Sequence, residues 1–170
     1  LIDLDLAPLH LCHGLHTSCT KLADALQRVN PLTLVLENAI SHIPALQIAK
    51  HNTEPLRVLI ANQNRGTDQR RMLSGLKRWL AEDPHLELVI LADRELAASL
   101  PQERIRFAHL LTYKRYRKMM GQCQLALLPL SRSVAHSCKT PIKLMECAAE
   151  SVATVSGPEL YRPQAIRGLS

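Results

Sequence analysis

The sequence predicts an α/β domain with a parallel sheet of five strands, doubly wound by helices. From Leu56 onward, short apolar runs typical of buried strands alternate with segments of helical periodicity. Hydrophobic residues make up 46% of the chain and charged residues 21%, a composition typical of globular proteins. Right-handed crossovers make 3-2-1-4-5, counted along the chain, the simplest strand order for such a sheet.

Five strand–helix units follow one another in this part of the chain. Strands are expected at residues 56–62, 86–92, 104–110, 125–130 and 152–156. Helices are expected over 68–81, 94–100 and 113–122, then from 141, and finally over 158–167. Asp68 and Thr112 are plausible helix caps, because their side-chain oxygens can accept hydrogen bonds from the free N–H groups of a first turn. Tyr113 and Tyr116 are expected to pack the helix that carries them.

The first fifty residues fit this alternation less well. Thr17–Val29 has the pattern of an amphipathic helix, and Leu32–Ile40 that of a strand that ends in a turn. Residues 41–55 show no firm periodicity and are expected to form a linker. Neither a start methionine nor a signal-like pattern is present at Leu1, which suggests an excised fragment.

The net charge of +6 is unevenly distributed. Between Arg104 and Met145 there is no Asp or Glu, whereas nine Lys and Arg residues fall in that stretch. Such a region suits an anionic ligand, nucleic acid or an acidic membrane surface, although Lys114–Lys118 would also fit a solvated helix face. Nucleic acid is disfavoured, because no known binding motif is present. No apolar stretch approaches the roughly 20 residues that span a bilayer.

The cysteines indicate a reducing compartment, and hence a cytoplasmic protein. There are five of them, an odd number without a C-x-x-C pair, which argues against a disulfide framework. His and Cys residues cluster between His10 and Cys19. Their spacing matches no common structural zinc pattern, so no metal site is predicted.

A candidate anion site lies between Gln124 and Gly157. An apolar strand is followed by a polar loop, and Thr140 and Pro141 are expected to open the next helix. Thr140 can cap free N–H groups, and Pro141 suits a first helical position because its missing N–H would have no partner there. Free N–H groups and the positive end of the helix dipole favour an anion, most simply a phosphate.

Charged side chains surround this predicted helix start. Lys139 and Lys143 flank it, and Glu146 follows one turn later, where a carboxylate can accept hydrogen bonds from sugar hydroxyls. Glu146 could instead form a surface ion pair with Lys143, three residues before it. Ligands of doubly wound sheets bind beyond the carboxyl ends of the strands, near the point where the strand order reverses. We therefore expect Arg65, in the loop after the first strand, to face Lys139 across one crevice.

These residues, in this order, resemble the carboxyl-terminal domain of GT-B-fold glycosyltransferases of the group-1 type. The resemblance covers roughly Thr17–Ser170, and its specific part is Gln124–Tyr161. Glu37–Ile40 also resembles the turn that joins the two domains in that family. The matching residues are Asn64, Arg65, Pro129, Leu130, Lys139, Thr140, Ile142, Lys143, Glu146, Ala148, Ala149 and Tyr161.

The resemblance implies a Rossmann-like domain at 54–170 that binds a nucleotide sugar for transfer to an acceptor, as in polysaccharide biosynthesis. Residues 1–53 would be the tail of an otherwise missing amino-terminal domain plus the linker. Donor-binding residues would be Arg65, Lys139, Thr140, Lys143 and Glu146, with Asn64 and His136 as further candidates. The nucleotide sugar is a substrate, so neither cofactor nor metal is implied; the implied partners are donor, acceptor and the missing domain. The basic face is a candidate for contact with a membrane surface.

Three departures from the family pattern leave a second interpretation open. Retaining members carry an acid eight residues before the position of Glu146, where this chain has Cys138. His136 stands where related sequences often have Asn, and Ser151 where a glycine is common before the last strand. We assign no catalytic residue on this basis. The alternative is a non-catalytic interaction or regulatory module that keeps the fold.

Overall fold

The computed structural model describes residues 7–46, 54–61 and 66–157. Its larger part is a five-stranded parallel sheet in the order β5-β4-β3-β6-β7, so the α/β class and the all-parallel sheet are confirmed. The strands are β3 (Leu56–Ile60), β4 (Leu86–Leu91), β5 (Ile105–Ala108), β6 (Leu125–Leu128) and β7 (Ala153–Ser156). The first of them in the chain, β3, lies in the centre, and the chain moves outward on one side and then on the other.

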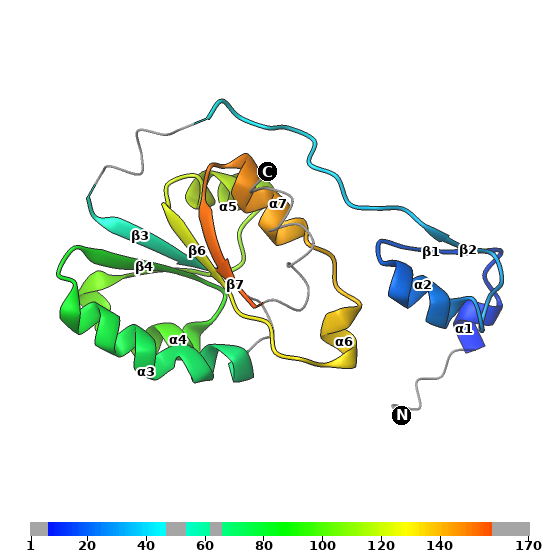
Figure 1. The fold of residues 1–170 in the computed structure, drawn as a ribbon, viewed down its shortest axis with the longest axis horizontal. Helices are drawn as coiled ribbons and strands as arrows, with labels where there is room; N and C mark the ends of the chain where they lie inside the picture. The colour runs from blue at the N-terminus through cyan, green and yellow to red at the C-terminus, as the bar shows by residue number, and fades with distance from the viewer. Residues whose placement is uncertain (1–6, 47–53, 62–65, 158–170) are drawn as a thin grey trace.

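Helices cover both faces of this sheet, as Figure 1 shows. One face packs against α3 (Gly66–Glu82) and α4 (Arg94–Ala98), and the other against α5 (Tyr113–Met120) and α7 (Ile142–Ala149). Successive strand residues point to opposite faces: Val58 and Ile60 belong to the α3–α4 core, and Leu59 to the α5–α7 core. The sheet is therefore buried on both sides, which explains why its strands are nearly continuous apolar runs.

Boundaries differ from the predictions by a few residues. The third predicted strand begins after a 3₁₀ turn, η2 (Gln102–Arg104), and the helix predicted from Asp68 begins two residues earlier. Thr112 stands at the cap position of α5, but its side chain makes no capping hydrogen bond. The helix predicted over 158–167 lies outside the described residues.

The amino-terminal part is a small β-α-β unit after a short helix. It consists of α1 (Ala7–His10), β1 (Leu15–Thr17), α2 (Thr20–Leu26) and β2 (Thr33–Val35), with β1 parallel to β2. The helix predicted over Thr17–Val29 was too long, because Thr17 pairs with Val35 in the sheet. Strand β1 was not predicted; with three residues it is too short for a periodic signal.

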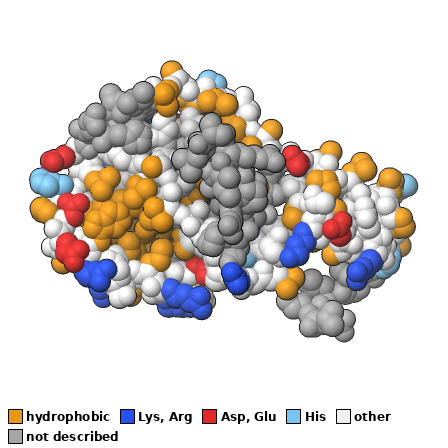
Figure 2. Space-filling model, viewed as in Figure 1, with side chains coloured by type: hydrophobic (Ala, Val, Ile, Leu, Met, Phe, Trp, Pro, Cys, Tyr) orange, Lys and Arg blue, Asp and Glu red, His pale blue; other side chains and the backbone are white. Residues whose placement is uncertain are grey.

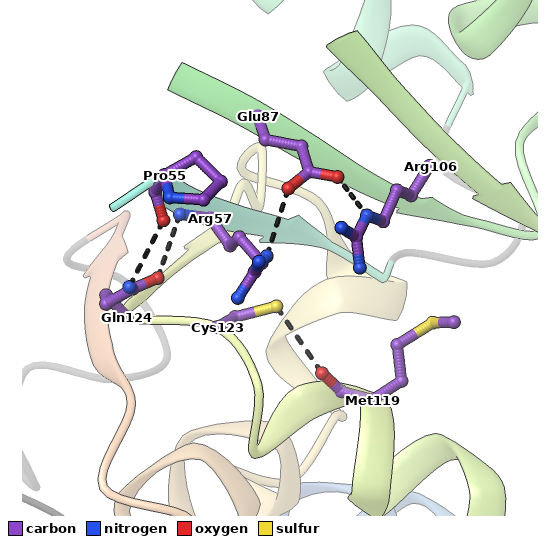
Figure 3. A network of polar contacts seen from close by, with 7 residues as sticks. All are labelled: Pro55, Arg57, Glu87, Arg106, Met119, Cys123 and Gln124. Atoms are coloured by element: carbon purple, nitrogen blue, oxygen red, sulfur yellow. Dashed lines mark hydrogen bonds and ion pairs between the residues drawn. The ribbon is translucent and has the colours of Figure 1, made fainter. Parts of the chain in front are cut away.

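Polar contacts fix the amino ends of the strands, as Figure 3 shows. Gln124, 4% exposed, accepts a hydrogen bond from the Arg57 backbone N–H (2.8 Å) and donates to the Pro55 carbonyl (3.3 Å). The Glu87 carboxylate forms ion pairs with Arg57 (3.0 Å) and with Arg106. These contacts hold β3, β4, β5 and β6 together at the edge opposite the candidate site.

The surface combines charged and apolar areas. In the view of Figure 2, hydrophobic side chains gather on the sheet domain, with Lys and Arg along its lower edge. Exposed apolar residues also occur on both sheets: Leu34 of β2 is 56% exposed and Val155 of β7 is 58% exposed. Among the described residues, no helix combines the length and apolarity needed to cross a membrane.

Candidate functional site

The carboxyl ends of β3 and β6 lie next to each other, because these two strands pair in parallel. The loops that follow them therefore emerge at the same edge of the sheet, where the strand order reverses. Lys139, half-buried, belongs to the segment after β6. Asn64 and Arg65 follow β3 but lie outside the described residues, so the crevice between Arg65 and Lys139 stays a prediction.

Thr140 does not cap the helix that follows it, contrary to the sequence prediction. Helix α7 begins at Ile142, with Pro141 as its cap residue and no side-chain capping bond. The Pro141 carbonyl accepts the first helical hydrogen bond, from the Met145 N–H (3.1 Å). Thr140 therefore stands one position too early, and its hydroxyl instead accepts a hydrogen bond of 2.7 Å from the Asn38 side chain.

The loop predicted between Ser131 and Thr140 contains a short helix, α6 (Val134–Ser137). The Ser133 hydroxyl caps it by accepting a hydrogen bond from the His136 N–H (3.0 Å). The His136 ring holds the loop, since its Nδ1 lies 2.7 Å from the Ser131 carbonyl. A carbonyl only accepts, so Nδ1 carries the proton and Nε2 is the nitrogen that can take another partner.

A cavity of about 190 Å³ lies at the carboxyl ends of β3, β4 and β5. Most of its wall is apolar, but Lys143 of α7, Tyr116 of α5 and His109, just after β5, contribute polar groups to it. Its lining residues are Ala61, Leu91, Ala92, His109, Leu110, Leu111, Tyr116 and Lys143. Ala92 has a positive φ of 66°, a conformation that is strained for an alanine and typical of ligand-binding edges. The sequence predictions missed this cavity, because its wall comes from five separate segments.

Tyr116 connects the two charged residues that the sequence placed on α7. Its hydroxyl donates a hydrogen bond of 3.0 Å to Glu146 Oε2, and the Lys143 ammonium lies 5.3 Å from its ring centroid. Glu146 is 6% exposed, so the interpretation of this residue as half of a surface ion pair is wrong. Burial, and then the Glu146 carboxylate, raise the pKa of Tyr116 far above its usual range.

Tyr116 was expected only to pack its helix. Its contact with Glu146 joins residues 30 positions apart on α5 and α7, and helical periodicity cannot predict such a pairing. An acid on an otherwise apolar helix face was the available signal: α7 buries Glu146, Cys147 and Ala149. A carboxylate in such a pattern needs a hydrogen-bond donor from a neighbouring element.

A second, larger cleft lies beside the loop after β6. Its volume is about 580 Å³, and Lys21 of α2 faces the polar loop across it. The loop contributes Arg132, His136 and three serines. No acidic residue occurs in the described lining of this cleft, so its charge is positive. Within the residues described, no group of three or more His, Cys, Asp or Glu side chains could hold a metal ion.

The site therefore comprises Lys143 and Tyr116 on the wall of one cavity, with the buried Glu146 hydrogen-bonded to Tyr116, and Lys139 and His136 on the neighbouring loop. The fold that positions them is Rossmann-like in general kind. Comparison with known proteins gives no match, either to a protein-family model or to a curated protein sequence.

Proposed function

We propose that this chain is the donor-binding half of a nucleotide-sugar-dependent glycosyltransferase with the GT-B fold. The observation that carries the proposal is the meeting of Lys143, Glu146 and Tyr116 beside a cavity at the carboxyl edge of a parallel sheet. Ligands of such sheets bind at that edge. The order of these residues along the chain supports the family assignment, through the resemblance described above.

In this proposal the cations of the site bind the diphosphate of the donor. Lys139 and Lys143 lie on the segment that leads from β6 into α7, and Arg65 belongs to the loop after the neighbouring strand. A nucleoside diphosphate gains negative charge as its bond to the sugar breaks. Fixed cations stabilise that developing charge, so they favour the transfer as well as the binding. Glu146 would accept hydrogen bonds from the ribose hydroxyls.

Calorimetric titration with UDP, GDP, ADP and CDP tests the proposal. At least one of them is expected to bind saturably, and Lys143→Ala and Arg65→Ala are each expected to weaken that binding about tenfold, since a charge-assisted contact is worth about 1.5–3 kcal/mol. Lys77→Ala, on α3 and away from the site, is the matched control. No saturable binding of any of the four nucleotides, or an equal effect of Lys77→Ala, would rule the donor site out.

A second candidate function is a non-catalytic module that binds a nucleotide without turnover. Cys138 favours it, because a thiol at the position of the family's first acid cannot do the work of a carboxylate. It predicts that no nucleoside diphosphate is released from a bound nucleotide sugar, even with an acceptor and the complete amino-terminal domain present. Release under those conditions would favour the transferase.

A further inference from the structure

Tyr116 lies between the two α7 residues that the proposed function assigns to the donor. Its ring faces the Lys143 ammonium at 5.3 Å, and its hydroxyl hydrogen-bonds Glu146 Oε2 at 3.0 Å. Tyr116 and Lys143 also line the cavity of about 190 Å³. The Tyr116 side chain therefore forms part of the cavity wall and also contacts the Lys143 ammonium and the buried Glu146 carboxylate.

The hydrogen bond from Tyr116 fixes the direction of the Glu146 carboxylate. An ionised carboxylate accepts about four hydrogen bonds, and the tyrosine hydroxyl occupies one of these acceptor positions. Because Glu146 is 6% exposed, only a small part of its side chain can reach a ligand. The orientation of the carboxylate thus decides which ligand atoms it can meet, and the remaining acceptor positions suit groups that donate hydrogen bonds.

A vicinal diol supplies two O–H donors at a spacing that matches the two oxygens of one carboxylate. A 2′-deoxyribose lacks one of them, so a buried acceptor position would stay without a donor in that complex. A buried acceptor without its partner costs about 1–3 kcal/mol, and sites built to bind a hydroxyl reject analogues that lack it.

We propose that Tyr116 is a positioning residue that orients Glu146 toward the ribose diol and makes the site selective for ribonucleotides over 2′-deoxyribonucleotides. The inference rests on the proposed function, since it takes the ligand to be a nucleotide. It adds to that function a residue on α5, outside Gln124–Tyr161, the specific part of the family resemblance.

The test compares each nucleoside diphosphate with its 2′-deoxy analogue by calorimetry on the full chain. The wild-type protein is expected to prefer the ribonucleotide by about tenfold or more. Tyr116→Phe keeps the ring and its contact with Lys143 but removes the hydroxyl. We expect it to reduce the preference to about threefold or less, mainly by weakening ribonucleotide binding. Tyr113→Phe, three residues earlier on the same helix, is the matched control and should keep the wild-type preference.

The outcomes separate this inference from the proposed function. If the wild-type protein binds no nucleoside diphosphate, the proposed function itself fails. If it binds ribo- and deoxyribonucleotides equally, or if folded Tyr116→Phe keeps the full preference, the donor site stands and the role of Tyr116 is refuted.

A measurement on the wild-type protein covers the case in which Tyr116→Phe does not fold. The ¹³C NMR signal of the Glu146 carboxylate is expected to shift on addition of the ribonucleotide and to shift much less with the deoxy analogue. The Tyr116 Cζ signal should move together with it. Equal shifts of the carboxylate signal for both nucleotides would overturn the inference without any variant.

Discussion

Asn38 and Thr140, 102 positions apart in the sequence, are joined by a hydrogen bond of 2.7 Å between the Asn38 side-chain N–H and the Thr140 hydroxyl. Asn38 belongs to the extended segment after β2, and Thr140 to the turn that leads into α7. The contact thus ties the segment that follows the amino-terminal unit to the start of the helix that carries Lys143 and Glu146. Thr140 was predicted to act on its own helix, but its partner comes from the other part of the chain.

A double-mutant cycle measures this contact. Asn38→Ala and Thr140→Val are each expected to lower the free energy of unfolding by about 0.5–1 kcal/mol, because the hydrogen bond is exposed and water replaces part of it. The double variant should lose no more than either single variant, as measured by urea denaturation. Thr112→Val is the control, since the Thr112 side chain makes no capping bond. Fully additive losses would show that the two side chains do not interact in solution.

The ion pair between Arg117 and Glu150 is expected to matter far more for stability. Arg117 Nη2 lies 2.6 Å from Glu150 Oε1, and both side chains are 11% exposed. Arg117→Leu leaves a nearly buried carboxylate without its cation, so we expect a loss of about 3 kcal/mol in urea denaturation. Replacing both residues by Leu should cost less than Arg117→Leu alone, because no uncompensated charge remains.

Arg78→Leu provides the comparison for that experiment. Arg78 pairs with Glu82 on α3, but their side chains are 79% and 68% exposed. An exposed pair contributes little, so this variant should change the unfolding free energy by less than about 0.5 kcal/mol. A similar loss in Arg78→Leu and Arg117→Leu would show that burial does not control the strength of these pairs.

The fold was predictable because the sheet of the main domain is buried on both faces. Strands such as β4, with Leu86, Leu88 and Ile90 all less than 2% exposed, leave a continuous apolar run in the sequence. Strand β1 has only three residues and leaves no such signal, whereas β2 lies within the strand predicted over Leu32–Ile40. Local pattern therefore identified the large sheet and missed half of the small one.

Only the part of the candidate site whose residues are close together in the sequence was predictable. Lys143 and Glu146 lie on α7 and Lys139 three residues before it, so their shared location follows from a stretch of eight positions in the sequence. Tyr116 and the cavity wall come from distant segments, which only tertiary packing brings together. The capping role of Thr140 failed because α7 begins at Ile142 with Pro141 at the cap position, and the Thr140 hydroxyl is bound instead by Asn38, 102 residues away.

The backbone conformation of Ser151 explains why a glycine is common at this position, before the last strand. It has a positive φ of 55° and ends α7 with two backbone hydrogen bonds, Ser151 N–H to Ala148 (3.0 Å) and Val152 N–H to Cys147 (2.8 Å). This is a Schellman motif, whose left-handed position favours glycine. Ser151→Gly is expected to raise the unfolding free energy by about 0.5 kcal/mol.

Replacing a serine by glycine inside a helix should instead lower the free energy of unfolding. Ser74 lies exposed within α3, so Ser74→Gly is expected to lower the unfolding free energy by about 0.5 kcal/mol through the added backbone entropy of the unfolded chain. Thermal or urea denaturation of the two variants beside the wild type distinguishes a backbone effect from a general effect of removing a serine. If Ser151→Gly lowered the unfolding free energy, the left-handed conformation of Ser151 would not be a source of strain.

Tyr116 gives the protein a predicted dependence of stability on alkaline pH. Burial first, and the Glu146 carboxylate second, raise its pKa in the folded state. The unfolded chain loses this proton above about pH 10, whereas the folded protein keeps it. The folded state then binds more protons than the unfolded state, so stability is fully present below about pH 10 and falls as the pH rises beyond it, by up to about 1.4 kcal/mol per pH unit for this group.

Urea denaturation of wild type and Tyr116→Phe between about pH 8 and pH 11 measures this slope. Lysines and other tyrosines titrate in both proteins, so the difference between the two curves isolates Tyr116. That difference is expected to be constant below about pH 9 and to shrink as the pH rises, because only the wild type loses the contribution of a protonated Tyr116. Curves that stay parallel over the whole range would show that the hydroxyl is not held by burial and by Glu146. The same hydroxyl would then be unable to orient the carboxylate at neutral pH.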